Sequence, residues 1–180
     1  MQETELYGPV KALLEGQGYE VKGEIGSCDL VAVRGDEPPV IVELKLSFTL
    51  ALVHQGIDRQ GVSDDVYLAV PPFTGRSARA RLREAETLCK RLGLGLMTVR
   101  AGDAPVVEVR LDPAEYRPRK RKARAGRLLR EFLRRVGDPA QGGSGRRGPM
   151  MTAYRQDALR CAILLDRDGP LKASILAART

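Results

Sequence analysis

Tryptophan and asparagine are absent from this sequence of 180 residues, and aromatic side chains, cysteine and histidine are scarce. The three cysteines, Cys28, Cys89 and Cys161, are odd in number and far apart, which argues against a disulfide framework or a zinc cluster. No apolar run approaches the roughly 18 residues of a membrane-spanning helix, and the N-terminal MQETELYG has no signal-peptide pattern. We therefore expect a cytoplasmic protein with no membrane partner.

What the sequence does contain is enough apolar material for a folded core. Apolar residues make up 43% of the chain, just under the average for globular proteins. A Gly-rich run, GDPAQGGSGRRG at residues 137–148, is typical of a linker. We expect one domain in residues 1–116, a basic segment with the Gly-rich linker in residues 117–148, and a helical tail in residues 149–180.

The positive charge of the chain is concentrated in one stretch. Between Arg117 and Arg135 there are ten basic residues and one acid, Glu131, a net charge of +9, which leaves −2 for the rest of a chain whose total is +7. Such a run is disordered or a solvated helix when free, and nucleic acid is the partner that it favours. The alternative is a linker whose charge only improves solubility.

Apolar periodicity predicts the order of helices and strands. Spacings of three and four predict helices over residues 3–15, 50–60 and 76–92. Runs rich in β-branched residues predict strands over residues 19–23, 27–34, 39–46, 65–70, 94–100 and 106–111, with a turn at residues 35–38. The order α-β-β-β-α-β-α-β-β indicates an α/β (α+β) protein, in which helices cover the faces of a mixed sheet.

The predicted strand VIVELKL, residues 40–46, carries two opposite charges on one face. Side chains alternate along a strand, so Glu43 and Lys45 share a face with Ile41. If residues 34–38 close a hairpin symmetric about Asp36, the numbers of paired residues sum to 72, and Asp29 lies directly opposite Glu43. Two carboxylates so placed repel each other unless a cation lies between them, and Lys45 or a divalent metal are the candidates. The alternative is a Glu43–Lys45 salt bridge on an edge strand, with Asp29 in a turn.

The helix predicted over residues 50–60 has a polar face that follows this strand. Gln55 and Arg59 are four residues apart and share that face, while Leu50, Val53 and Ile57 are expected on the opposite, buried face. Arg59 is therefore a candidate to bind a phosphate group through two hydrogen bonds. The alternative is a polar face exposed to solvent.

An Asp early in one strand, then Glu-x-Lys in the next, with a helix before and after, resembles the PD-(D/E)XK nuclease-like superfamily. More closely, ETELYGPVKALLEGQGYEV, CDLVAV, PPVIVELKLSF, LALVHQGIDRQ and DDVYLAVP resemble an uncharacterised bacterial family assigned to that superfamily as phosphodiesterases. The resemblance covers residues 1–116 and implies a restriction-endonuclease-like α-β-β-β-α-β core with an extra helix and strands. The Pro of the superfamily motif is absent, because Cys28 precedes Asp29.

The resemblance also implies roles for individual residues. Asp29 and Glu43 would bind Mg²⁺ or Mn²⁺ together with the backbone carbonyl of Leu44, and Lys45 would position the attacking water or stabilise charge on the phosphate. Glu5, on the first helix, corresponds to an acidic position that supplements such a site; its alternative is a solvated acid favoured by the helix dipole. Gln55 resembles a glutamine that contacts substrate or the metal shell.

Nucleic acid is thus the expected partner, with DNA favoured over RNA, and a homodimer is compatible with the sequence but not indicated by it. The tail resembles the start of a helix-turn-helix. Two functions are expected: a metal-dependent nuclease, or a non-catalytic nucleic-acid-binding protein on the same fold. A scaffold for protein interactions is a third. The residues expected to contact nucleic acid are Arg59, Arg117, Arg119, Lys120, Arg121, Lys122 and Arg124.

Overall fold

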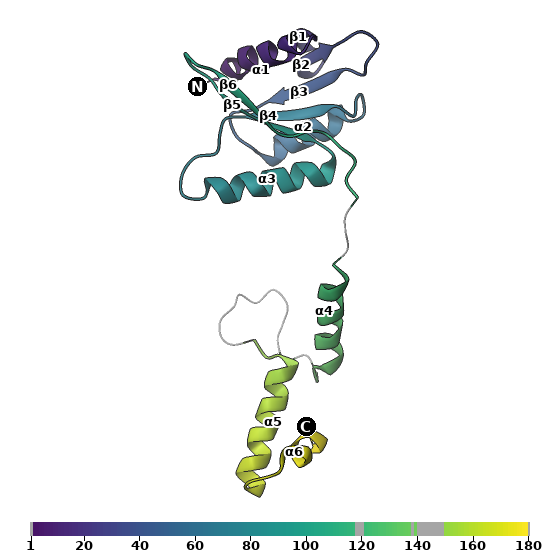
Figure 1. Ribbon diagram of the computed structural model, residues 1–180, viewed down its shortest axis with the longest axis vertical. Coiled ribbons are helices and arrows are strands. Elements are labelled where there is room, and N and C mark those ends of the chain that lie inside the picture. Colours follow the sequence, from purple (N-terminus) through teal and green to yellow (C-terminus); the bar gives the residue numbers. More distant parts are fainter. Residues whose placement is uncertain (1, 118–120, 138, 140–149, 180) are drawn as a thin grey trace. The chain divides into compact units, whose positions relative to one another are not determined.

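A six-stranded sheet organises the N-terminal part of the chain, as the β-branched runs predict (Figure 1). In this computed structural model, residues 2–117, 121–137, 139 and 150–179 are described. The chain divides into two compact units, residues 1–118 and 119–180. The strands are β1 (Glu20–Ile25), β2 (Cys28–Val33), β3 (Val40–Leu44), β4 (Val66–Val70), β5 (Gly95–Arg100) and β6 (Val106–Leu111).

The strands lie in the sheet in the same order as in the sequence. β3, β4 and β5 are parallel to one another, while β1–β2, β2–β3 and β5–β6 are antiparallel pairs. Parallel neighbours need a crossover connection, and the helices α2 (Leu50–Arg59) and α3 (Ala78–Leu92) provide it. The predicted mixed sheet and the predicted order α-β-β-β-α-β are therefore both confirmed.

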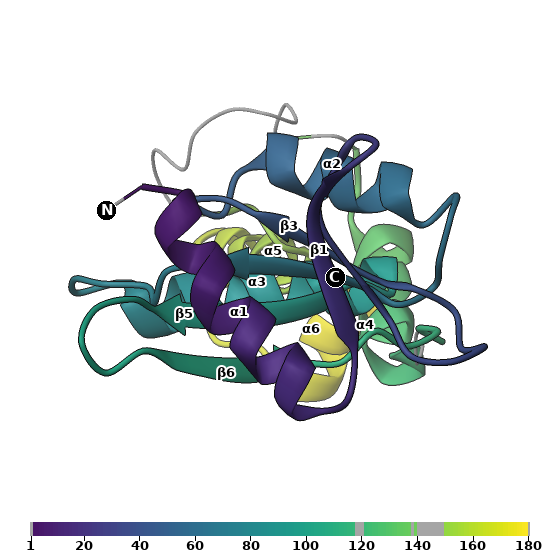
Figure 2. The ribbon, with the colours of Figure 1, turned by 90° about the horizontal axis from the view of Figure 1, so that it is seen from above.

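Three helices cover the two faces of the sheet. α1 (Thr4–Gly16) lies on one face, and α2 and α3 lie on the other (Figure 1). Seen from above, α1 lies across the sheet (Figure 2). Leu6, Val10 and Leu14 of α1 pack on Val42 of β3, whereas Leu52 and Val53 of α2 pack on the other side of the sheet, in the core cluster that contains Ile41. Because side chains alternate along β3, this strand contributes Val42 to one core and Ile41 to the other.

The predicted buried face of α2 is right at Val53 and wrong at Leu50 and Ile57. Leu50 and Ile57 are exposed to 69% and 39%, and the buried residues are Leu52, Val53 and Gly56. The cause is the close approach at Gly56, where an added Cβ would lie 2.7 Å from a methyl carbon of Leu68. A glycine lets the helix backbone approach β4, and this rotates Leu50 and Ile57 away from the sheet.

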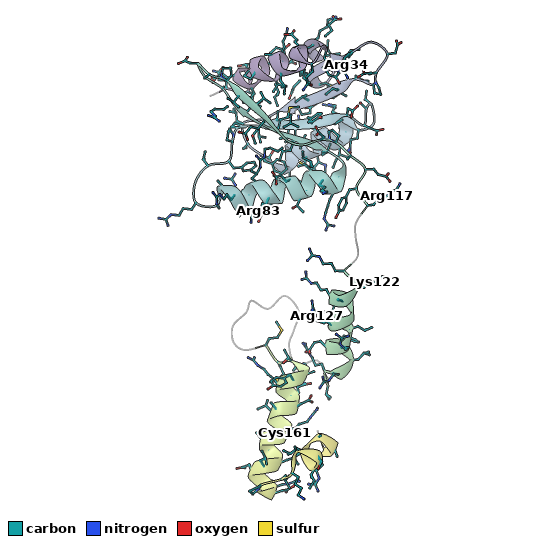
Figure 3. All side chains as sticks on the ribbon, in the orientation of Figure 1. Arg34, Arg83, Arg117, Lys122, Arg127 and Cys161 are labelled. Atoms are coloured by element: carbon teal, nitrogen blue, oxygen red, sulfur yellow. The ribbon has the colours of Figure 1, made fainter. Side chains whose placement is uncertain are left out.

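The second unit contains α4 (Lys122–Arg134), α5 (Ala153–Asp168) and α6 (Ala173–Arg179). The basic stretch is therefore a solvated helix over most of its described length. Arg124, Arg127 and Arg130 share one side of the helix, and Leu128, Leu129, Phe132 and Leu133 share another. Figure 3 labels Lys122 and Arg127 on this helix. Leu128, Phe132 and Leu133 are more than 70% exposed. Glu131 accepts a hydrogen bond from the Ala153 N–H, which ties α4 to the start of α5.

Among the described residues, no helix has the combination of length and apolar character that a membrane span requires.

Candidate active site

The β2–β3 hairpin brings two acids together at its open end. Leu30 lies opposite Val42, and Val31 lies opposite Ile41, which is the register that the symmetric turn predicts. One step further along the same register, Asp29 stands opposite Glu43. The turn that joins the strands lies at the other end of the hairpin, so the two carboxylates lie where the strands separate.

Asp29 marks the point where regular pairing of β2 with β3 ends. Its Oδ2 accepts a hydrogen bond from the Leu44 N–H at 2.8 Å, in place of a β2 carbonyl. Across the β1–β2 pair, Glu24 lies between the paired residues Gly23 and Ile25 and has φ of +54°. A non-glycine residue in this left-handed region stores roughly 1 kcal/mol or more of strain, and such residues gather at functional sites.

Glu43 is fully buried, and a cation from α2 neutralises it. Arg59 Nε donates to Glu43 Oε1 at 2.6 Å, and Arg59 Nη2 donates to the Ser27 carbonyl. The other oxygen, Oε2, is buried without a hydrogen-bond partner among the described residues. Burial raises the pKa of Glu43 above its ordinary value; the hydrogen bond from Arg59 opposes this shift, and the negative charge of Asp29 adds to it.

Lys45 directly follows the last residue of β3. Its N–H donates to the Ala69 carbonyl of β4, so the hydrogen bonding between β3 and β4 extends to Lys45. Lys45 Nζ lies 3.2 Å from Oε1 of Glu3, just before α1. That Glu43 and Lys45 share a face stays a prediction. The alternative of a Glu43–Lys45 salt bridge on an edge strand is wrong, since β3 is an interior strand and Glu43 pairs with Arg59.

A cleft of about 440 Å³ opens beside Asp29. Its acids are Asp29, Glu3 and Glu24, whereas Glu5, the predicted supplementary acid, accepts a hydrogen bond from the exposed Gln2 N–H. Sequence analysis did not select Glu3, which is the residue before α1. The one signal that could have identified it is its spacing of three residues from the buried Leu6, which predicts that both lie on the same side of the helix. The residues lining this cleft are Glu3, Thr4, Tyr7, Gly23, Glu24, Asp29 and Leu44.

Arg59 contacts groups of the protein itself. Its guanidinium is shared between Glu43 and the Ser27 carbonyl, and its side chain is only 13% exposed. Arg59 is thus a positive group beside the opposed carboxylates, where the candidates expected from the sequence were Lys45 or a metal. That Arg59 also binds a phosphate group stays a prediction. Gln55, one turn earlier on α2, is partly buried.

The basic residues predicted to contact nucleic acid lie in the region that joins the two units. Arg117 is exposed and pairs with Glu115 at 3.0 Å. Arg121, Lys122 and Arg124 are exposed at the start of α4, and Figure 3 labels Arg117 and Lys122. Arg119 and Lys120 lie outside the described residues.

Asp29 and Glu43 offer carboxylate oxygens to a divalent cation. Within the described ranges, no group of three or more His, Cys, Asp or Glu side chains is arranged to hold a metal. Mg²⁺ commonly takes only one or two protein carboxylates and completes its shell with water and phosphate oxygens. Asp29 and Glu43 supply two carboxylates, and the unpartnered Oε2 is an oxygen that a cation would satisfy. These residues therefore fit a hard cation that takes few of its ligands from the protein and the rest from water and phosphate oxygens.

Comparison with known proteins gives one match. No curated protein and no solved structure matches the chain. Residues 97–180 match the family described as "Putative PD-(D/E)XK phosphodiesterase (DUF2161)". This span runs from β5 to α6, so it lies after Asp29, Glu43 and Lys45 in the sequence. The family named by the resemblance is thereby confirmed over residues 97–180, of which only residues 97–116 belong to the span that carried the resemblance. Over a little under half of its length, the protein is similar to this family, which is described as PD-(D/E)XK phosphodiesterases.

Proposed function

We propose that this protein is a metal-dependent phosphodiesterase that hydrolyses phosphodiester bonds of nucleic acid, with DNA as its favoured substrate. The observation that carries the proposal is the pairing of Asp29 with Glu43 at the open end of the hairpin, with the Glu43 Oε2 buried and unpartnered among the described residues. The family match of residues 97–180 supports the same chemistry.

Each residue of the site has a separate task. Mg²⁺ or Mn²⁺ held by Asp29, Glu43 and the Leu44 carbonyl would lower the pKa of a water molecule and neutralise charge on the phosphate. The Leu44 N–H and Arg59 orient the two carboxylates. Lys45 positions the attacking water or stabilises the charge that develops on the phosphate oxygens.

Glu3 holds the Lys45 ammonium group beside the cleft. Lysine is suited to this position because its ammonium is a compact charge on a flexible stem, so it can move from Glu3 to a phosphate oxygen when substrate binds. Gln55, partly buried on α2, is proposed to contact the substrate or the water shell of the cation.

The second candidate is a nucleic-acid-binding protein without catalytic activity. Arg59 already neutralises Glu43, which is the arrangement that a binding fold would retain after losing a metal. The basic helix α4 would then carry the whole function, through the phosphate contacts of its exposed arginines.

Cleavage assays with labelled DNA and RNA distinguish these functions. The full chain is incubated with each substrate in the presence of Mg²⁺, Mn²⁺ or a chelator, alongside Asp29→Asn and the matched control Asp36→Asn in the exposed turn of the same hairpin. We expect cleavage that requires the divalent ion, is lost in Asp29→Asn and is retained in Asp36→Asn. Binding without cleavage under all conditions would favour the second candidate. Cleavage by Asp29→Asn at the wild-type rate would show that the active site does not include Asp29.

A further inference from the structure

A second hollow is lined by residues that directly follow Lys45 in the sequence. We call it the phenylalanine groove; it has a volume of about 300 Å³. It opens just beyond Leu44 and Val70, the last residues of the neighbouring parallel strands β3 and β4. The crevice outside the carboxyl ends of parallel strands is where open α/β sheets bind ligands. Its lining residues are Leu46, Ser47, Phe48, Pro71, Pro72, Phe73, Thr74 and Arg81.

The groove combines aromatic rings with one positive charge. Phe48 and Phe73 have ring centroids 6.4 Å apart, with an angle of 47° between the rings. The Arg81 guanidinium carbon lies 5.4 Å from the centroid of Phe73. The chain has only three phenylalanines, and two of them meet at this edge of the sheet. Arg81 is the one charged residue of the lining, so the groove suits a flat aromatic group attached to an anion.

The two hollows follow one another along the backbone. Leu44 lines the cleft beside Asp29 and Leu46 lines the phenylalanine groove, so in the sequence Lys45 separates the two linings. If the phosphate to be cut lies at Lys45, as the proposed function requires, the nucleotide next to it along the strand reaches the groove. A volume of about 300 Å³ is at the small end of ligand pockets, so a single base fits and a base pair does not.

We propose that the phenylalanine groove binds an unpaired nucleobase next to the phosphate at Lys45, so that the substrate is single-stranded or has an unstacked end. Phe48 and Phe73 provide the surfaces against which the base stacks, and Arg81 pairs with the following phosphate. Stacking of this kind does not depend on base identity, because every base has a π face. This proposal rests on the proposed function for the substrate class, but it concerns binding alone.

The test measures binding in chelator, so that no cleavage is involved. A labelled single-stranded oligonucleotide and a hairpin duplex with the same number of phosphates are titrated into full-length protein, and the ratio of the two affinities is compared among variants. Phe48→Leu and Phe73→Leu keep apolar packing but remove the aromatic face. Phe132→Leu, at the third phenylalanine on the exposed face of α4, is the matched control.

We expect wild type and Phe132→Leu to favour the single strand, and each groove variant to lose roughly 5- to 100-fold of single-strand affinity. Arg81 is exposed on α3, so Arg81→Gln does not threaten folding. This variant should weaken single-strand binding and flatten its dependence on log salt by about 0.7.

Equal affinity of wild type for both probes, or unchanged single-strand binding and salt slope in Arg81→Gln, would overturn the proposal even where the enzyme cleaves DNA. Conversely, the expected pattern without any cleavage by wild type would retain the groove and reject the phosphodiesterase function.

Discussion

Arg59 Nε lies 2.6 Å from Glu43 Oε1, and this ion pair fastens α2 to the end of β3. Glu43 is fully buried, so without Arg59 its charge would be uncompensated. Removing one partner of a buried pair destabilises a protein by about 3–5 kcal/mol. Arg59→Met should therefore lower the free energy of unfolding strongly at pH 8, and less at pH 5, where Glu43 can take up a proton.

Chemical denaturation at both pH values measures this effect. Arg34→Met is the control, because Arg34 pairs with Glu37 on the surface and such pairs contribute about 0–1 kcal/mol. Equal, small losses in Arg59→Met and Arg34→Met would mean that Glu43 is not buried as a charge.

The raised pKa of Glu43 predicts a pH dependence of stability. Because the folded protein binds this proton more tightly than the unfolded chain does, the stability due to Glu43 is fully present below its unfolded pKa of about 4.3. That stability is lost as the pH rises through the folded pKa. The difference in unfolding free energy between wild type and Glu43→Gln should therefore fall with rising pH in metal-free buffer. Carboxylates with lowered pKa, such as Glu131, act in the opposite direction but cancel in the difference.

A divalent ion should reverse this trend. Adding Mn²⁺ should raise the melting temperature of wild type more at pH 8 than at pH 5, because the ion binds the deprotonated site. Glu43→Gln should show a much smaller rise at either pH. A melting temperature that responds equally to Mn²⁺ in both proteins would locate the ion elsewhere.

Asp29 has a structural role besides the catalytic one proposed for it. Asp29→Ala leaves the Leu44 N–H without its acceptor, at an expected loss of about 1–3 kcal/mol. Asp29→Asn keeps a carbonyl oxygen that can accept the same hydrogen bond, so its stability should stay near that of wild type. Both variants should lack activity. Thermal unfolding separates the two effects, and identical stability of the Ala and Asn variants would show that the hydrogen bond contributes nothing.

Lys45 should matter for turnover and little for folding. Its partner Glu3 is 43% exposed and Lys45 itself is 38% exposed, so the ion pair is expected to contribute less than about 1 kcal/mol. Lys45→Met should therefore melt close to wild type, keep the response to Mn²⁺ and lose cleavage. Glu3→Gln releases the ammonium group and should preserve cleavage. A Lys45→Met variant with wild-type turnover would exclude the lysine from the chemistry.

The basic side of α4 should set the salt dependence of DNA binding. Replacing Lys122, Arg124, Arg127 and Arg130 with Gln keeps helix propensity and removes four positive charges. Each phosphate contact contributes about −0.9 to the slope of log affinity against log salt on duplex DNA, so the slope should flatten by up to about 4. Replacing Arg76, Arg79, Arg83 and Lys90, which are exposed and lie outside the phenylalanine groove, with Gln tests whether any loss of four charges suffices. An unchanged slope in the α4 variant would mean that these four residues do not contact DNA phosphates and that the charge of α4 only improves solubility.

The register of the hairpin could be predicted because its causes are local. Alternating apolar residues in β2 and β3 and a turn of Gly, Asp, Glu and Pro leave one register that buries both faces correctly, and this register aligns Asp29 with Glu43. The partner of Glu43 could not be predicted in the same way. Arg59 reaches Glu43 only because Gly56 lets α2 approach β4, and that approach is a tertiary contact with no periodic signal in the sequence.

The contact of Glu3 with Lys45 could not be predicted, for a related reason. Glu3 and Glu5 both lie near the start of α1, and the rotation of this helix on the sheet, fixed by Leu6 and Val10, decides which acid reaches Lys45.

The separate origins of Glu43's two neighbours have a consequence for the order of folding. Arg59 is 16 residues from Glu43 in the sequence, and Asp29 is at a similar separation (43 − 29 = 14), so loop closure alone does not order the two contacts. The contacts differ in kind: Asp29 arrives with the pairing of two strands, whereas Arg59 arrives only once α2 has formed and packed on β4. Until α2 docks, the end of the hairpin holds two carboxylates without their arginine. A divalent ion present during refolding is therefore expected to stabilise the hairpin before α2 docks, and the gain in refolding rate should be lost in Asp29→Asn.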